Sequence, residues 1–521
     1  MSLTKRVISA FLVLVMLFSV LYAGNQVKEQ EKQEVFDNTR TLHIWYTDEA
    51  LTDYISSMAV RYNEEHGVRV IPTLQSGLEL LQKINEASLT SDYYPDLYIA
   101  SNDNMEKAYL AGLAMEIADK DGVVSLSNFP ESAMHAVTYQ QKILGYPFYY
   151  ETSALLYNMT YLEQLAQKEI QAELDDAAQE AKEAAEAEAK ALEEAKKESE
   201  SKKDTDKKDS TKTTEESDDK EQAEETVSAN TISNEEMAEL VHERVPALIP
   251  TTFEALLEFA DSYDAPQNVE AVFKWDVEDI FYNYFFAGNY MDFGGMCGDS
   301  KDSIDIYNEE AIHALMVYQD LSDYFAIDAS NVEYNSVIQE FMEGKVVMTT
   351  ATTDIIRKLD QAKESGEFEY DYGIAPIPKL NSEMDTKSLS VTNTIYINGY
   401  TEMKKEANDF AKYLVMEHAG DLYEATGKVP ANKNVRYENP NLDMFMDEYQ
   451  DSAPMPKLMA ISNFWVKMEI MFERIWNGEE VSKELKKLSE DLMTQVTGEP
   501  YEEEYIKVKE KEEEFIDYSD D

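Results

Sequence analysis

Residues 146–158 read YPFYYETSALLYN, and this stretch breaks off after Glu163 and resumes as VPALIPTTFE at residues 245–254. Both pieces are dense in apolar and aromatic side chains, which is typical of chain that is buried in a core. The residues between them are mostly Glu, Lys, Ala, Asp, Ser and Thr, with no Phe, Tyr or Trp. One folded unit is therefore interrupted by a charged insertion, residues 164–244.

The insertion divides into three parts by composition. Gln164 to about Lys197 is rich in Ala, Glu and Lys, which favour a helix but offer too little apolar surface for a separate core. Residues 199–225 are almost free of hydrophobic side chains and are predicted to be disordered. Ser233 and Glu236 match a capping box that opens a short helix. We interpret the insertion as a surface loop, and the alternative is a docking arm or a cell-wall spacer.

The overall composition disfavours several classes of function. The chain of 521 residues is 43% hydrophobic with a net charge of -58, so it can bury a large core but is poorly suited to nucleic acid. Its one cysteine, Cys297, permits no internal disulfide and no Cys-based metal site. The six histidines are scattered without metal-ligand spacing, and the chain has no P-loop or Gly-rich nucleotide turn. We therefore expect no metal and no cofactor.

Residues 1–24 predict an export segment. Lys5 and Arg6 precede a nearly all-apolar run from Val7 to Ala23, which ends in small residues. Cleavage after Ala23 is favoured over a retained membrane anchor. Residues 25–37 are interpreted as a polar tether. The protein is therefore expected outside the cell or at its surface.

Strands and helices alternate in the first part of the folded chain. Apolar side chains recur every three to four residues in the helical segments, whereas the strands are short apolar runs. This alternation predicts an α/β fold with a parallel sheet covered on both faces. The predicted order is a strand at 41–46, a helix at 48–65, a strand at 68–72, a helix at 78–88 and a strand at 96–100.

In such sheets ligands bind beyond the carboxyl ends of the strands. Trp45 and Tyr46 end the first predicted strand, and Ser101 and Asn102 follow the third. We therefore predict that these four side chains contact a ligand. The alternatives are core burial for the two aromatic residues and helix capping for Ser101 and Asn102.

Several short phrases follow one another in an order that resembles the family 1 extracellular solute-binding proteins of bacterial ABC importers. This group includes the maltodextrin-binding proteins. The resemblance covers about residues 40–162 and 245–497. The matching phrases are YPFYYETSALLYN at 146–158, IPTTFEAL at 249–256, FMEGKVVM at 341–348, GIAPIP at 373–378, TGKVPAN at 426–432, ISNFW at 461–465 and IWNG at 475–478.

The resemblance implies a fold of two α/β lobes, of the type II periplasmic-binding-protein kind. Crossover strands would join the lobes, and ligand in the cleft between them would drive a hinge closure. The insertion would then lie within lobe two. The implied division is lobe one at 38–147 and 350–398, lobe two at 148–349 and 399–497, and a fraying acidic tail at 498–521.

The resemblance also implies a function without catalysis. Such a protein captures a carbohydrate, in this case an oligosaccharide, and delivers it to the permease subunits of an ABC importer. ATP is hydrolysed elsewhere in that system. We expect the protein to act as a monomer.

Five further site residues are implied by their places in the family phrases, because a sugar site needs flat apolar faces and carboxylates or amides. Glu151 matches a ligand carboxylate, or else is a salt-bridged hinge residue. Trp465 matches an aromatic that stacks on sugar, or else is a core residue. Trp275 and Glu278 lie where the family places contacts from lobe two. Thr352 lies in a further segment that the resemblance implies as part of the site.

Two departures from the sugar-binding pattern leave the ligand open. Thr352 lies where many sugar-binding members carry a Pro-Trp pair, and Glu469 replaces a basic residue one helical turn after Trp465. The ligand is then a different sugar or not a sugar. A secreted glycan-active enzyme and a sensory or structural surface protein are the alternative functions. Paired carboxylates do not favour the enzyme, because they are unavoidable among 104 acidic residues.

Overall fold

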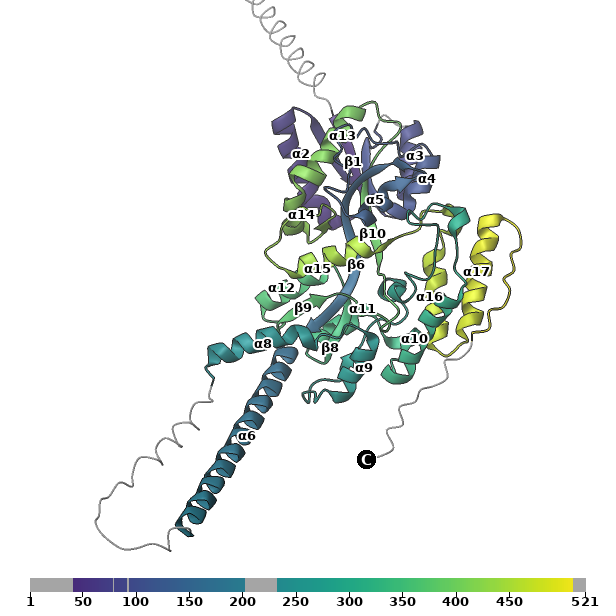
Figure 1. The fold of residues 1–521 in the computed structure, drawn as a ribbon. Coiled ribbons are helices and arrows are strands. Elements are labelled where there is room, and N and C mark those ends of the chain that lie inside the picture. Colours follow the sequence, from purple (N-terminus) through teal and green to yellow (C-terminus); the bar gives the residue numbers. More distant parts are fainter. Residues whose placement is uncertain (1–40, 78, 91–92, 202–231, 509–521) are drawn as a thin grey trace, which may run out of the picture.

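The computed structural model describes residues 41–77, 79–90, 93–201 and 232–508, and for residues 196–201 only the backbone. The predicted export segment and tether lie outside these residues, as does most of the stretch that was predicted to be disordered. Figure 1 shows an upper and a lower body joined by a long strand, with one helix projecting far from the lower body.

The upper part of the sheet is mixed rather than fully parallel. β1 (Thr41–Tyr46) pairs in parallel with both β2 (Arg69–Leu74) and β3 (Leu97–Ser101). β10 (Leu389–Ile397) lies next to β3 and runs antiparallel to it. The predicted strand–helix–strand order is therefore confirmed, and the chain adds an antiparallel strand from much later in the sequence.

One strand, β6 (Gly145–Asn158), belongs to both parts of the sheet (Figure 1). Its first part pairs with β10 as far as Thr152, and its second part pairs with β8 (Val346–Thr352) from Ser153 onward. β8 in turn pairs in parallel with β7 (Ala271–Phe273), and β9 (Tyr372–Ala375) also pairs with β6. The YPFYYETSALLYN phrase at residues 146–158 therefore lies in the strand that links the two bodies.

The buried side chains form two clusters, of which the first includes β6 residues from Tyr146 to Leu156 and the second includes Leu155 and Tyr157. The first cluster packs beneath α2, α3, α4, α5, α12, α13, α14 and α15. The bounds of these helices are Thr52–His66, Leu80–Thr90, Met105–Leu110, Glu131–Val137, Ile355–Ser365, Lys404–Lys412, Ala419–Thr426 and Asn441–Asp451.

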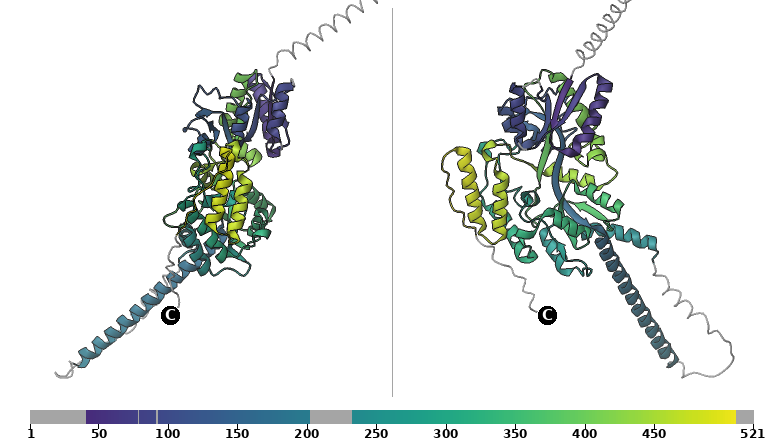
Figure 2. Two further views of the ribbon diagram at one scale, coloured as in Figure 1. Left: turned by 90° about the vertical axis from the view of Figure 1, so that its right-hand side faces the viewer. Right: turned by 180° about the vertical axis from the view of Figure 1, so that it is seen from behind.

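The second cluster is dominated by aromatic side chains around the fully buried Trp275. α11 (Tyr334–Met342) contributes to both clusters. Figure 2 shows α16 and α17 packed side by side at the edge of the second body. The other helices around the second cluster are α9 (Phe253–Ser262), α10 (Glu309–Phe325), α16 (Phe464–Trp476) and α17 (Val481–Thr497).

The residue division into lobes stays a prediction, and the first cluster contains residues from both assigned parts, among them α13, α14 and α15. These helices fall in the part assigned to lobe two, yet Phe410 and Tyr449 belong to the first cluster. Tyr449 stacks on Tyr150 of β6 with 3.9 Å between ring centroids. α14 packs against α2 of the upper body, whereas α15 contacts β6, α5 and also β9, and local sequence patterns do not reveal these partners.

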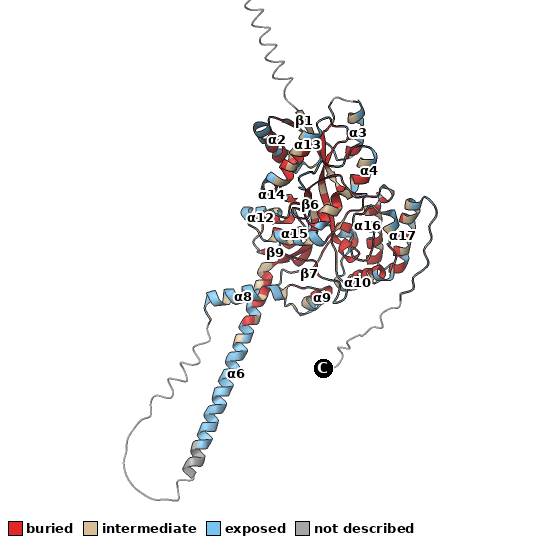
Figure 3. Ribbon diagram, turned by 45° about the horizontal axis from the view of Figure 1, so that its top comes forward, coloured by how far each residue is buried: buried red, intermediate tan, exposed pale blue. Residues whose placement is uncertain are grey.

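The charged insertion leaves the second body as α6 (Met159–Ser201) and returns as α8 (Asn234–Leu248). The capping box of Ser233 and Glu236 is present, and Arg244 pairs with Glu169 and Glu173 at the base of α6. Beyond that base the side chains of α6 are almost all exposed (Figure 3). The predicted solvated helix is confirmed for the described residues. Within those residues, no helix combines the length and apolar character required to cross a membrane.

The described part of the acidic tail does not match the expected fraying. Ile506 and Val508 pack against the second cluster. The backbone N–H of Ile506 donates to the Tyr307 hydroxyl at 2.7 Å, and Ser489 donates to Glu503 at 2.7 Å. Two apolar side chains within a charged stretch are enough to dock it against the second body.

Candidate functional site

The carboxyl ends of the parallel strands converge on the middle of β6. Ser101, the last residue of β3, pairs with Asn393 of β10, which pairs with Tyr149 of β6. From the other body, Thr352 at the end of β8 pairs with Ser153 of β6. Since open α/β sheets bind ligands at these ends, the region where the two bodies meet is the candidate binding cleft.

The upper side of this region carries a group of charged side chains from three segments. Lys428 lies 3.0 Å from Asp48 Oδ2, which follows β1, and 3.1 Å from Glu151 Oε1 on β6. Its ammonium also lies 5.5 Å from the centroid of the Tyr149 ring. Burial opposes the charge of Lys428, but the two carboxylates outweigh it and raise its pKa.

The lower side carries a continuous row of aromatic rings. Thr352 Oγ1 lies 3.1 Å from the Tyr334 hydroxyl, and the Tyr334 ring stacks on Tyr282 with centroids 4.5 Å apart. Phe281 directly precedes Tyr282 in the sequence, and its ring stacks on that of Trp465 of α16 with centroids 6.1 Å apart. Trp465 is only partly buried. This row connects the end of β8 with the start of α16 and offers a partly exposed indole face.

Carboxylates lie beside the aromatic row without a cationic partner in the described chain. Burial raises the pKa of Glu278, and the charges of Glu473 and Asp276 raise it further. Burial likewise raises the pKa of Glu469, and Asp279 adds to the shift. The lower side therefore has a negative field, which favours neutral or cationic solutes over anions.

Four of the predicted site residues border this region with accessible side chains. Glu151 and Thr352 flank the point at which β6 changes partners, while Glu278 and Trp465 lie on the lower side. Glu151 also has the salt bridge that was the alternative explanation, since Lys428 contacts it. Trp45 is half-buried at the end of β1, with its ring partly packed on the first cluster.

The other predicted residues have structural roles in this conformation. Tyr46 is 2% exposed within the first cluster, and Trp275 is 0% exposed with its Nε1–H donated to Asn283. Asn102 is also 0% exposed. Its side-chain amide donates to Met455 O and accepts from the backbone N–H of Thr392. Ser101 donates to Asp103. We leave these four out of the proposed site, because a ligand would have to open the core or displace those contacts.

The sequence prediction missed Asp48, Lys428, Tyr282 and Tyr334. Asp48 lies two residues after Tyr46, so the strand-end rule would have included it with a slightly wider window. Lys428 is part of the TGKVPAN phrase, but nothing local indicates its contact with Glu151 far earlier in the chain. The two tyrosines show no periodicity that separates a cleft from a core.

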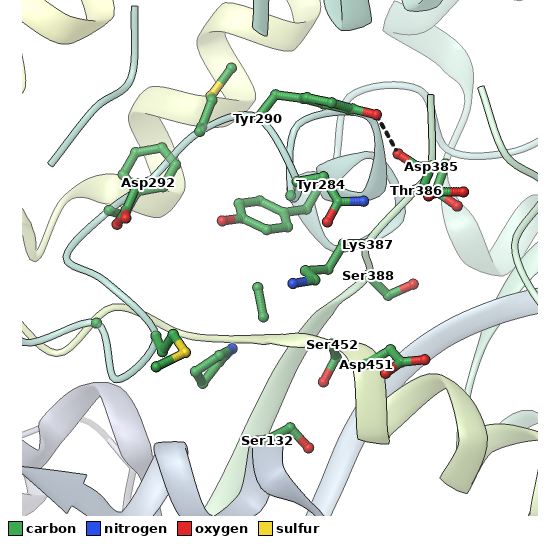
Figure 4. A pocket seen from close by; sticks show the side chains of 18 of the residues that line it. Ser132, Tyr284, Tyr290, Asp292, Asp385, Thr386, Lys387, Ser388, Asp451 and Ser452 are labelled. Carbon is green, nitrogen blue, oxygen red and sulfur yellow. Dashed lines mark hydrogen bonds between the residues drawn. The ribbon is translucent and has the colours of Figure 1, made fainter. Parts of the chain in front are cut away.

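A cavity with a volume of about 1230 Å³, which we call the rear cavity, lies elsewhere. It is lined by α5, by the end of α15 and by parts of residues 284–310 and 376–388 (Figure 4). None of the nine predicted site residues lines it. Tyr150 faces α15, whereas Glu151 points the opposite way because successive strand residues alternate. The rear cavity and the candidate cleft therefore lie on opposite faces of β6.

The described residues contain no group of three or more His, Cys, Asp or Glu side chains arranged to hold a metal ion. Cys297 is free and half-buried, and burial raises the pKa of its thiol.

The chain belongs to a family of bacterial extracellular solute-binding proteins. The model of that family matches residues 57–186 and 166–456. A maltotriose-binding protein from Pyrococcus abyssi (strain GE5 / Orsay) is 22% identical over 280 residues, which are 51% of this chain and 59% of that protein. The match thus spans less than two thirds of this relative.

Solved structures of similar fold cover most of the chain. An extracellular solute-binding protein from Staphylococcus aureus in complex with maltose has a TM-score of 0.63 at 17% identity, covering 88% of this chain and 98% of that one. A cyclo/maltodextrin-binding protein complexed with maltotetraose has a TM-score of 0.62 at 16% identity, covering 88% and 97%. These likenesses establish the two-lobed α/β fold.

Proposed function

We propose that the protein captures a carbohydrate, most simply an oligosaccharide, in the cleft where the two bodies meet at β6. The observation that carries this proposal is the convergence of strand ends with an aromatic row on one side and carboxylates on the other. The names of the relative and the solved structures, which refer to maltose and its oligomers, support the same class of ligand.

Each side of the cleft has a distinct task in this proposal. The indole of Trp465 stacks on the apolar face of a sugar ring, as aromatic rings do when their edges remain wet. Glu151 and Asp48 accept hydrogen bonds from sugar hydroxyls, and Lys428 holds both carboxylates in place. Glu278 and Glu469 add further acceptors on the lower side.

Closure of the two bodies would complete the site. β6 and β10 pass through the point at which the bodies meet, so a small rotation about these strands changes the cleft width. Ligand drives closure only as far as it binds the closed form better than the open one. The contact of one sugar with both sides would supply that difference.

The finer points of the proposal follow the family. The protein acts as a monomer without catalysis, outside the cell, and delivers its ligand to the permease of an ABC importer. Glycan cleavage would require a positioned acid and a second carboxylate. Asp48 and Glu151, a carboxylate pair on the upper side, are both engaged by Lys428, which lies between them.

A thermal-shift and tryptophan-fluorescence screen against malto-oligosaccharides and other neutral oligosaccharides tests the proposal. We expect at least one to bind saturably without release of reducing ends. Trp465→Ala should weaken that binding about thirtyfold, which corresponds to roughly 2 kcal/mol for a central aromatic contact. Val466→Ala, on the exposed neighbouring position, is the matched control. A panel with no binder, or release of reducing ends, would contradict the proposal.

A further inference from the structure

Three polar side chains present their polar groups to the rear cavity. Ser132 is 2% exposed, and its Oγ makes no hydrogen bond of standard geometry to the described residues, although it interacts with the Tyr449 hydroxyl. Tyr284 is 4% exposed, and Figure 4 shows its hydroxyl and the Lys387 ammonium pointing into the cavity. No bond or ion pair to another described side chain satisfies either group. Buried polar groups are almost always hydrogen-bonded in folded proteins, so the buried Ser132 hydroxyl can take a further partner, while the half-buried Lys387 ammonium and the Tyr284 hydroxyl are open to a molecule in the cavity.

The three groups come from separate elements that the fold holds together. Ser132 is on α5 of the first cluster, whereas Tyr284 packs in the second cluster against Phe293 and Phe464. Lys387 donates its backbone N–H to Phe285 O at 3.3 Å. A Cβ on Gly288 would lie 2.1 Å from Lys387 O, so this close approach depends on glycine. The cavity is therefore a formed site between the two bodies.

A buried lysine outside the cavity fixes the two bodies on this face. Lys457 is 1% exposed and donates to His135 O on α5 at 2.8 Å and to Cys297 O in the second body. Asp299, two residues after Cys297, accepts from Gln140 N at 2.6 Å. The rear cavity thus has walls that are already joined without a ligand.

The charges around the cavity restrict what it accepts. Acidic lining residues outnumber the two lysines, and Lys379 is already paired with Asp385 at 2.7 Å. Burial lowers the pKa of His135, which keeps its ring neutral at pH 7. The net negative charge of the wall therefore repels an anion, and a ligand must in addition accept hydrogen bonds from the Lys387 ammonium, which the charged group of an organic cation does not do. The acidic lining residues are Glu131, Asp292, Asp305, Glu309, Glu310, Asp385, Asp447, Glu448 and Asp451.

A neutral molecule with several hydroxyls satisfies both requirements. Each hydroxyl accepts from Lys387, Tyr284 or Ser132 and donates to a carboxylate of the wall. The Tyr284 and Tyr290 rings and Met291 supply apolar surface. A volume of about 1230 Å³ exceeds the roughly 300–1,000 Å³ of common small-molecule sites, so more than one sugar ring fits.

We propose that the rear cavity is a second binding site, separate from the cleft, for a neutral polyhydroxylated molecule of the size of a disaccharide or trisaccharide. An occupant would contact both bodies on the face of β6 opposite to Glu151. None of the nine predicted site residues of the cleft lines this second site.

Calorimetric titration of the full chain tests this site. The probes are maltose, maltotriose, cellobiose, chitobiose and sucrose, with glucosamine and gluconate as charged comparisons. We expect a 1:1 event to persist in Trp465→Ala and to weaken at least tenfold in the double variant Tyr284→Phe with Lys387→Met. Both changes preserve side-chain size. Lys301→Met, at an exposed position outside the cavity lining, is the control.

The outcomes separate the two sites. If Trp465→Ala abolishes all neutral-sugar binding, the rear site is overturned while the proposed function stands. If the only binding event is lost in the rear double variant, the rear site is supported and the placement of sugar in the cleft is overturned. Binding of glucosamine or gluconate in preference to every neutral probe overturns the ligand class, and absence of any binding overturns both proposals.

Discussion

Two lysines on opposite sides of the sheet meet contrasting environments. Lys428, at the candidate cleft, lies between Asp48 and Glu151, and their charges outweigh burial and raise its pKa. Lys457, near the rear cavity, is completely buried among backbone carbonyls, and burial lowers its pKa to about 8. Carboxylates within 3.1 Å stabilise the charged form of Lys428. The uncharged carbonyls around Lys457 stabilise its charged form less.

The difference shows how each face of the molecule is built. At the cleft, charge is concentrated and partly exposed, so it is available to a polar ligand. Behind the sheet, the Lys457 ammonium donates to backbone carbonyls of α5 and of Cys297. Its hydrogen bonds therefore connect the two bodies. The first arrangement is that of a binding site, and the second is that of a structural tie.

The largest expected effect concerns Lys457. Its pKa is about 8 in the fold against 10.5 in the unfolded chain, so between these values the unfolded state binds more protons and stability rises with pH. Relative to Lys457→Met, the wild type should gain about 2 kcal/mol in unfolding free energy between pH 7 and pH 10. Urea unfolding at a series of pH values measures this, and a constant difference between the two proteins would contradict it.

Glu448 lines the rear cavity, and its effect on the unfolding free energy should change with pH in the opposite direction to that of Lys457. Burial raises its pKa from 4.5 to about 7, although Ser388 and the backbone N–H of Ile377 donate to it. Its contribution is fully present below pH 4.5 and is lost as pH rises through 7. The wild type should therefore lose about 2 kcal/mol relative to Glu448→Gln between pH 4.5 and pH 7.5. Asp447→Asn, at the exposed neighbouring position, should show no such trend.

Lys428 should show a smaller effect on stability. Lys428→Met leaves Asp48 and Glu151 without the cation that neutralises them, but both carboxylates are partly exposed. We expect a loss of about 1 kcal/mol in unfolding free energy, measured by urea denaturation. Lys168→Met, which breaks an exposed pair with Asp264, is the matched control with an expected change near zero. Equal losses in both variants would remove the distinction between the cleft group and an ordinary surface pair.

The smallest expected effect concerns the projecting insertion. Replacing residues 177–238 with a short Gly-Ser linker removes exposed helix but keeps the base, where Arg244 pairs with Glu169 and Glu173. Sugar affinity and unfolding free energy should then stay within about 0.5 kcal/mol of the wild type. Loss of sugar binding in titration calorimetry would show that the insertion acts on the cleft.

The elements of the fold were largely predictable, because apolar periodicity and caps are local. The strand at Thr41–Tyr46 agrees with its predicted bounds, and Gly67 ends α2 in the left-handed conformation. The residues against which each helix or strand face packs were not predictable. Nothing local indicates that Asn102 bonds to Met455 or that Trp275 is enclosed by aromatic rings. The strand-end rule therefore leads to the region where the two bodies meet, but it does not tell which side chains stay open to that region.

The most direct test of the central claim is ¹⁹F NMR of protein labelled with 5-fluorotryptophan, titrated with the tightest neutral oligosaccharide of the screen. The four tryptophans give separate reporters, of which Trp275 and Trp476 are buried and Trp45 and Trp465 are partly open. Binding in the cleft predicts that the Trp465 resonance shifts most and that Trp275 shifts least. A saturating titration that leaves the Trp465 resonance unmoved would contradict the claim.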